Sequence, residues 1–435
     1  MTRLIWLATA ALVVAPGPLL AQAKKPAARP PVQQVIPPKT VYWMSASTQA
    51  GFGMSGKAPS AGDMMKMAMG GGMGGPTKLL DLDLGSKVPP TGPPAAQHGI
   101  LPVMNMGSSL ALKTPVPVAG KSTPTEREDF ERPKGRLLLF WGCGETARPG
   151  QPIVIDFAKA AAGQHPANLF GGERIRIARG PTASTWPTYG RWPNDDRGSR
   201  QSVPGNASLL GAHKVTGNYT PPIDFTLTQD WMDGLDMKQA KAPSGALGLS
   251  WNMIPTATAH YAQMMGASEA GNEADGPTVV FWSSSDVQTF ISGLSDFIAP
   301  AEATRLVGKK QLMPPTQTTC AVPKEAMTAA PTGIITLVAH GPEQNFVHPP
   351  RPEDPRTPWV QDWTVKARFV SRTGAIAGMD MGDMSGGQSS SSSKGRKPKC
   401  QPDSATAVGK ALGGSVGGAI GGMFGGKKKK NPDCE

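Results

Sequence analysis

The sequence predicts a mainly β protein with two β-rich domains, flanked by disordered segments rich in Pro, Gly, Met and Ser. Three observations support this fold class. The 435 residues include 53 glycines and 44 prolines, and only 39% are hydrophobic, which suits turn-rich β structure better than helical bundles. Short apolar runs, some strictly alternating, recur along the chain between Gly, Pro or Asn residues. Their close spacing favours an all-β domain or sandwich over helix-linked βαβ units.

The first 23 residues are typical of a secretory signal peptide. Arg3 precedes an apolar run that continues to Leu20, and small residues at 21 and 23 stand before Lys24. A transmembrane helix is a poorer interpretation, because the run contains two prolines and is shorter than the ~20 residues that a span requires. We therefore expect an exported protein, periplasmic or at the cell surface.

The net charge of +12 comes from the two ends of the chain. Residues 394–430 hold nine cations and one acid, and residues 1–39 hold five cations and no acid, so the remainder sums to −1. Basic tails are typical of solvated segments or of segments that contact anionic surfaces. The charge distribution therefore gives no reason to expect a nucleic-acid partner.

The N-terminal half divides into a linker and a β domain. Residues 24–77 are Pro-rich and then Gly/Met-rich, with one candidate strand at 40–48. The N-terminal β domain is expected at 78–221 and begins with KLLDLDLGS, which has the alternation of a half-buried strand. Further strands are expected in RLLLFWGCG, PIVIDF, ERIRIAR (173–179) and AHKVTGNYTPPIDFTLT. The Trp-rich stretch at 185–200 lacks periodicity and is expected to be a long loop.

A family resemblance appears in the second half of the chain. The stretch LGLSWNMIPTATAHYAQMMGA (247–267) resembles the B and C strands of a fibronectin type III or related immunoglobulin-like domain, with Trp251, Ala259 and Tyr261 on the pattern. TQTTCAVPKEAMTAAPTGIITLVAHGPE resembles the E strand, turn and F strand, and WTVKARFVS (363–371) resembles the last strand. The resemblance covers about 222–372 and implies a β-sandwich, with a short helical insertion at 300–310. It implies little about function, because such domains serve as adhesion modules, spacers and enzyme appendages.

The C-terminal segment has a repeat of its own. After a low-complexity linker at 373–408, residues 409–435 form a basic tail containing the tetrapeptides ALGG, SVGG, AIGG and MFGG. On a helix these would make a glycine-zipper face. Many glycines oppose a free helix in water, so the tail is either disordered or ordered only against itself or a membrane surface. The predicted membrane or self-association residues are Gly409, Gly413, Gly417, Gly421, Gly425, Leu412, Val416, Ile420, Phe424, Lys427, Lys428, Lys429 and Lys430.

Four cysteines in an exported chain suggest two disulfides, for which three connectivities are possible. We favour Cys143 with Cys320, one from each predicted domain, and Cys400 with Cys434 around the glycine-rich tail.

The 21 methionines suggest an alternative function, because thioether clusters can bind Cu(I) in an oxidising compartment. The candidate ligands are Met64, Met65, Met67, Met69, Met73, Met379, Met381 and Met384. Copper motifs of this kind usually include histidine, and neither cluster contains one. A flexible Gly/Met linker or an adaptable apolar contact surface is therefore the favoured interpretation of both segments.

Sequence motifs identify no catalytic or cofactor-binding residues. PVAGKST (117–123) lacks the first glycine of a phosphate loop, and the six histidines never stand at metal-ligand spacing. A glycan-binding role for Trp186 and Trp192 would need converging carboxylates, for which Asp195 and Asp196 are the nearest candidates. The sequence therefore predicts a non-catalytic, exported cell-envelope protein with a structural or binding role, whose tail contacts an anionic membrane surface or a second copy of the chain.

Overall fold

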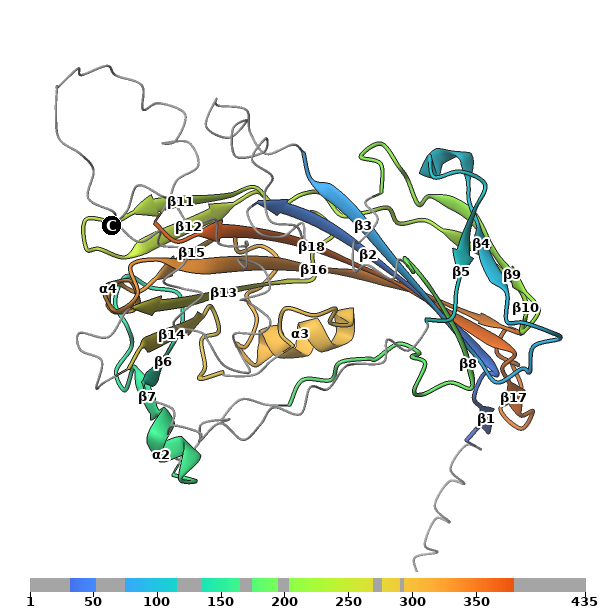
Figure 1. Cartoon of the computed structure of the whole chain (residues 1–435), viewed down its shortest axis with the longest axis horizontal. Helices are drawn as coiled ribbons and strands as arrows, with labels where there is room; N and C mark the ends of the chain where they lie inside the picture. Colours follow the sequence, from blue (N-terminus) through green and yellow to red (C-terminus); the bar gives the residue numbers. More distant parts are fainter. Residues whose placement is uncertain are drawn as a thin grey trace, which may run out of the picture.

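The computed structural model describes residues 32–51, 75–115, 135–164, 174–194, 203–268, 276–289 and 293–378. These residues form a mainly β structure, which confirms the predicted fold class. A long, twisted sheet runs through the molecule, and two smaller sheets pack on it near its opposite ends (Figure 1).

The long sheet has nine strands, and its central strands are unusually long. In spatial order they are β7 (Ile153–Asp156), β6 (Arg136–Trp141), β14 (Thr278–Ser283), β13 (Ala259–Ser268), β16 (Gly333–His348), β18 (Trp363–Ile376), β2 (Thr40–Gly51), β3 (Thr77–Ser86) and β8 (Thr188–Trp192). The pairs β6–β14 and β18–β2 are parallel, and the other neighbours are antiparallel. β2, whose first residues match the candidate strand at 40–48, therefore lies inside the sheet.

A three-stranded sheet covers one end of the nine-stranded sheet and makes a sandwich-like core with it. Its strands, in order, are β11 (Met237–Lys241), β12 (Leu247–Trp251) and β15 (Thr319–Val322). Leu249 and Trp251 of β12 share one buried core with Met264, Trp282 and Ile335 of the large sheet. Trp282 is fully buried, and its indole N–H donates to the carbonyl of Gly142 at 2.9 Å.

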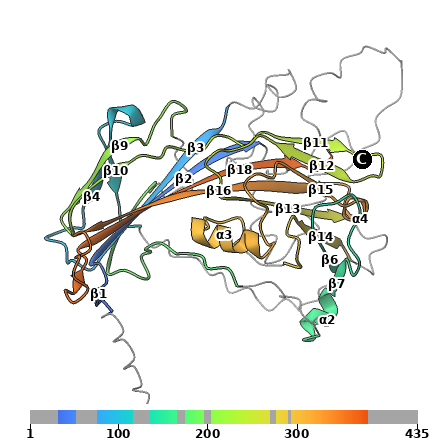
Figure 2. The ribbon, with the colours of Figure 1, turned by 180° about the vertical axis from the view of Figure 1, so that it is seen from behind.

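A four-stranded sheet covers the other end of the same sheet (Figures 1 and 2). Its strands, in order, are β10 (Thr220–Leu227), β9 (Gly211–Gly217), β4 (Ala96–Gly99) and β5 (Ser109–Leu112), and the short 3₁₀ helix η1 (Pro102–Met104) lies between β4 and β5 in the chain. Val215 and Ile223 are fully buried and belong to the same continuous core as Tyr42 and Leu84. β1 (Val35–Ile36) and β17 (Trp359–Val360) form a separate parallel pair.

Three α-helices lie in the described part of the chain: α2 (Phe157–Ala161), α3 (Pro300–Gly308) and α4 (Lys324–Ala329). α3 packs on the face of the nine-stranded sheet that the two smaller sheets leave free (Figure 1). Its buried Ala303 and Leu306 contact Ala259 and Tyr261 of β13 in a second hydrophobic cluster. The helical insertion predicted at 300–310 is thus confirmed.

Two local predictions are wrong. Residues 174–179 of the predicted strand ERIRIAR form no strand, because side chains of α3 and β18 bind their backbone groups. The Trp-rich stretch expected to be a loop contains β8, which pairs with β3 and buries Trp192. Both segments take their backbone partners from distant parts of the chain, which local periodicity does not encode.

The predicted domain ranges do not correspond to separate sheets. The boundary expected between residues 221 and 222 lies within β10. Strands from both ranges, and β2 from the predicted linker, occur together in the nine-stranded sheet. The ranges 78–221 and 222–372 therefore contribute to one shared core.

Candidate functional site

A band of charged and aromatic side chains crosses the centre of the nine-stranded sheet on the α3 side. On β18, Lys366, Arg368 and Arg372 alternate with core residues, because successive side chains of a strand point to opposite faces. The parallel pairing with β2 places Trp43 opposite Lys366 and Ser45 opposite Arg368. Residues from strands distant in sequence thus form one polar surface.

The guanidinium of Arg368 is held between two aromatic rings. Its central carbon lies 4.7 Å from the centre of the Trp43 ring and 4.3 Å from that of Phe297. Arg368 Nε also donates to Ser45 Oγ at 2.8 Å. Burial lowers the pKa of Arg368, while nearby carboxylates, Asp83 first among them, act in the opposite direction. The arrangement is a cation–π stack supplemented by hydrogen bonds, which fixes the arginine in place.

Carboxylates compensate the cations of this band. The Tyr189 hydroxyl donates to Asp83, whose pKa is raised mainly by burial and lowered in part by this hydrogen bond. Lys366 forms an ion pair with Glu343, and the two side chains are only 21% and 11% exposed. These charged groups are thus engaged with other side chains of the body, and removing one partner would leave an uncompensated, largely buried charge.

Residues 174–180, which we call the arginine strap, cross the polar band. The Arg176 N–H donates to Glu302 Oε1 at 2.9 Å, and Arg305 Nη2 donates to the Arg174 carbonyl at 3.0 Å. At the other end, Gly180 packs directly on the Trp43 ring. The strap therefore joins α3 to the centre of the sheet. In Figure 1 the strap runs below α3.

A chain of buried hydrogen bonds connects the four-stranded sheet to the nine-stranded sheet. The Tyr42 hydroxyl lies 2.8 Å from His98 Nδ1, and His98 Nε2 lies 3.1 Å from His213 Nδ1. His213 Nε2 lies 2.7 Å from the Leu209 carbonyl, which can only accept, so one consistent set of donors runs from Tyr42 through both neutral histidines. The pKa of His98 is lowered to about 3, first by burial and then by His213. Burial also lowers the pKa of His213.

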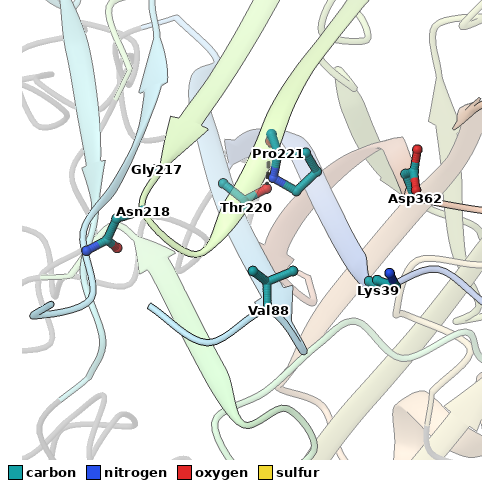
Figure 3. A pocket seen from close by; sticks show the side chains of 7 residues that line it. All are labelled: Lys39, Val88, Gly217, Asn218, Thr220, Pro221 and Asp362. Atoms are coloured by element: carbon teal, nitrogen blue, oxygen red, sulfur yellow. Dashed lines mark hydrogen bonds between the residues drawn. The ribbon is translucent and has the colours of Figure 1, made fainter. Parts of the chain in front are cut away.

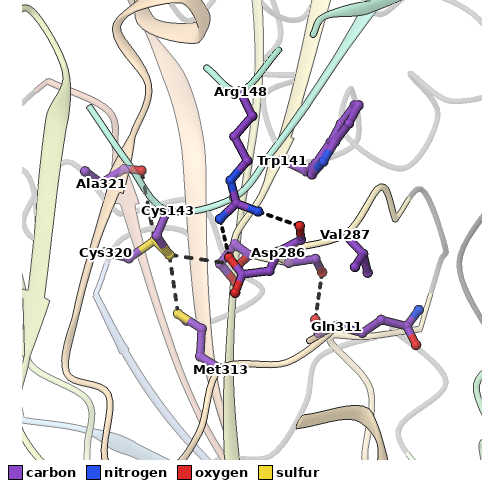
Figure 4. A network of polar contacts seen from close by, with 12 residues as sticks. Trp141, Cys143, Arg148, Asp286, Val287, Gln311, Met313, Cys320 and Ala321 are labelled. Carbon is purple, nitrogen blue, oxygen red and sulfur yellow. Dashed lines mark hydrogen bonds and ion pairs between the residues drawn. A yellow bond between two sulfur atoms is a disulfide. The ribbon is translucent and has the colours of Figure 1, made fainter. Parts of the chain in front are cut away.

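The disulfide between Cys143 and Cys320 lies within a network that links the loop after β6 to the loop after β14 (Figure 4). Arg148 makes an ion pair with Asp286 and also donates to the Asp286 carbonyl. Ser285 Oγ donates to the Gln311 carbonyl at 2.7 Å. The covalent link connects the three-stranded sheet to the loop that follows β6, so it crosses the sandwich-like core.

An open pocket of about 440 Å³ lies near the start of β2 and the β9–β10 turn (Figure 3). Its charged residues are Lys39 and Asp362. The Asn218 amide in its wall is used structurally, because it accepts from the Ala95 N–H and donates to the Pro93 carbonyl. The lining residues are Lys39, Val88, Gly217, Asn218, Thr220, Pro221 and Asp362.

The structure tests only some of the residues singled out from the sequence. The disulfide predicted between Cys143 and Cys320 is present. Cys400 and Cys434, both methionine clusters and the tail residues from 409 to 430 lie outside the described residues, as do Asp195 and Asp196. Sequence reasoning missed the pairing of His98 with His213, because 115 residues separate them and only the β4–β9 register brings them together.

Within the described ranges, no group of three or more His, Cys, Asp or Glu side chains is placed to hold a metal ion. The helices found there are too short or too polar to cross a membrane. Comparisons with protein-family models, curated proteins and solved structures gave no significant match. The fold and its contacts therefore define the molecule only as a mainly β, sandwich-like protein with an internal disulfide.

Proposed function

We propose that this chain is an exported, non-catalytic protein of the cell envelope, in which the β body is a rigid scaffold and the C-terminal tail contacts an anionic membrane surface or a second copy. The observation that carries the scaffold role is the polar band. Its Arg368 is stacked between Trp43 and Phe297, and its ion pair and carboxylate contacts are internal. Because these side chains already bind one another within the body, we assign them a structural role.

Export is supported by the Cys143–Cys320 disulfide, because such bonds form and persist mainly in oxidising compartments. The apolar segment and small-residue pattern of residues 1–23 point the same way. Periplasmic or cell-surface localisation is the corresponding proposal.

The strand pairings support the fibronectin type III-like interpretation of residues 222–372. In immunoglobulin-like sandwiches the B and E strands lie in one sheet, and the C, F and last strands lie in the other. Here β12 and β15, the proposed B and E strands, pair with each other. β13, β16 and β18, the proposed C, F and last strands, are consecutive neighbours in the nine-stranded sheet. We propose a sandwich of this type whose larger sheet is extended at both edges.

The tail is tested by fractionating cells that express the full chain or a form ending at Gly395. The four lysines at 427–430 each contribute about 1 kcal/mol near an anionic surface, so salt should release the full chain from membranes. The shortened form should stay in the soluble fraction. Equal solubility of both forms, with the same behaviour on anionic vesicles, would refute the tail's role.

A further inference from the structure

The arginine strap exposes a row of cations on the α3 side of the body. Arg174, Arg176 and Arg179 are exposed, whereas Ile175 and Ile177 are half-buried. Ile175 packs on the hydrophobic cluster of α3, and Ile177 fits against Gly293, where a Cβ would lie 2.3 Å from its Cδ1. The alternation of extended backbone therefore turns the isoleucines inward and the first two arginines outward.

The row is held in place through contacts to its backbone. The Arg176 charge also helps to lower the pKa of Glu302. The strap backbone is fixed by Glu302, Arg305 and Arg368, through bonds to main-chain atoms at 2.9, 3.0 and 3.4 Å. Within the described ranges, no ion pair joins any of the three exposed arginines to a carboxylate. Within the strap itself, residues 174–180 contain three arginines and no acidic residue. A pre-positioned cationic ridge loses little freedom on binding an anionic partner.

We infer that the arginine strap is a second contact for anionic lipid headgroups, carried by the folded body itself. This inference rests on the proposed envelope function, because it assigns a further surface to the same kind of partner. The strap spans at most roughly 18 Å from Arg174 to Arg179, so its charges can meet several headgroups at once.

Lipid is favoured over single-stranded nucleic acid by the position of the aromatic rings. Sequence-independent binding of single strands combines cations with exposed aromatic faces on which bases stack. The rings of this surface already carry cations. Trp43, on which Gly180 packs, contacts Arg368, and Phe297 contacts Arg368 and Arg372. Trp186, further along the same segment, contacts Lys87. The strap thus offers charge without a stacking platform.

Vesicle sedimentation of the full chain tests the inference. Phosphatidylcholine vesicles with and without phosphatidylglycerol are compared for the native chain, the strap variant R174Q/R176Q/R179Q, and the tail variant in which lysines 427–430 become glutamine. Each cation near an anionic surface raises the partition coefficient roughly five-fold. The strap variant, which lacks three cations, should therefore bind the anionic vesicles about 100-fold more weakly at low salt. The lysine variant R174K/R176K/R179K should retain binding, because the surface attracts charge rather than guanidinium geometry.

The control variant K214Q/K238Q/K241Q removes the same charge from exposed positions on β9 and β11. Equal binding by the strap and control variants would overturn the inference, as would stronger binding of the native chain to single-stranded DNA than to vesicles. A loss confined to the tail variant would overturn the strap contact and leave the proposed function intact. A loss of vesicle binding in the strap variant alone would refute membrane contact by the tail and support membrane contact by the strap. The single variants R174Q, R176Q and R179Q, each expected to lose about five-fold, provide the test if the triple variant does not fold.

Discussion

Replacing His98 with glutamine should remove the contribution of one buried histidine to the acid sensitivity of the fold. His98 is fully buried between Tyr42 and His213, at the junction of the two sheets. A glutamine carbonyl can accept the Tyr42 hydroxyl proton and its amide can donate to His213, but the side chain does not titrate. The substitution therefore keeps much of the hydrogen bonding and removes one proton-binding group.

The magnitude follows from the pKa of His98, which is about 3 in the folded protein and about 6.5 in an unfolded chain. Between these values the unfolded chain binds one more proton than the folded protein. Above about pH 6.5 His98 is neutral in both states and does not change the stability. As the pH falls from 6.5 toward 3, protonation of His98 in the unfolded chain progressively lowers the free energy of unfolding. At pH 5 the loss is about 2 kcal/mol, taking about 1.4 kcal/mol for each pH unit below 6.5.

The assay is urea denaturation at pH 7 and pH 5, followed by tryptophan fluorescence. The native protein should lose about 2 kcal/mol more between the two conditions than the H98Q variant. H348Q is the matched control, because His348 is exposed and lies outside the buried chain of hydrogen bonds. An unchanged pH dependence in H98Q would show that protonation of this group does not govern acid unfolding.

Three further substitutions test the core and the polar band. Changing Cys143 and Cys320 to serine removes a covalent link between positions 177 residues apart. The free energy of unfolding should fall by up to about 5 kcal/mol in denaturant titrations. An unchanged value would contradict the stabilising role of the disulfide. Trp282→Ala empties a fully buried site and should cost about 3–5 kcal/mol by calorimetry, with Trp282→Phe costing clearly less. Arg368→Met keeps the apolar stem but removes the stacked guanidinium, and should cost about 1–3 kcal/mol in the same denaturation assay; unchanged stability would refute the stabilising role of the stack.

Local patterns predicted the strands well where one face of the strand is buried. The alternating leucines of β3 mark an observed strand, because burial on one face requires a period of two. The continuous apolar run of β6 also marks a strand, in which the successive residues Leu138, Leu139 and Phe140 are buried on both faces. The Cys143–Cys320 disulfide was predictable in part, since four cysteines allow only three connectivities.

Pairings between distant segments were beyond the reach of sequence patterns. The strap has the alternation of a strand, but its backbone groups bind Glu302, Arg305 and Arg368 in place of a neighbouring strand. The His98–His213 contact depends on the register of β4 with β9. Trp43 looked like an ordinary strand residue, and its contact with Arg368 arises only from the parallel β2–β18 pairing.

The parallel pairing of β2 with β18 has a consequence for how the chain is made. Residues 40–51 lie beside residues 363–374 at the centre of the sheet. The hydrogen bonds of β2 to this neighbour can therefore form only after β18 has been synthesised. A nascent or truncated chain that ends before residue 363 leaves β2 with an open edge, which is a template for aggregation. The central sheet is thus completed only after nearly all of the folded body has been synthesised. A chain shortened from the C-terminal side into β18 should therefore lose the whole folded body. The loss should not be confined to a peripheral part.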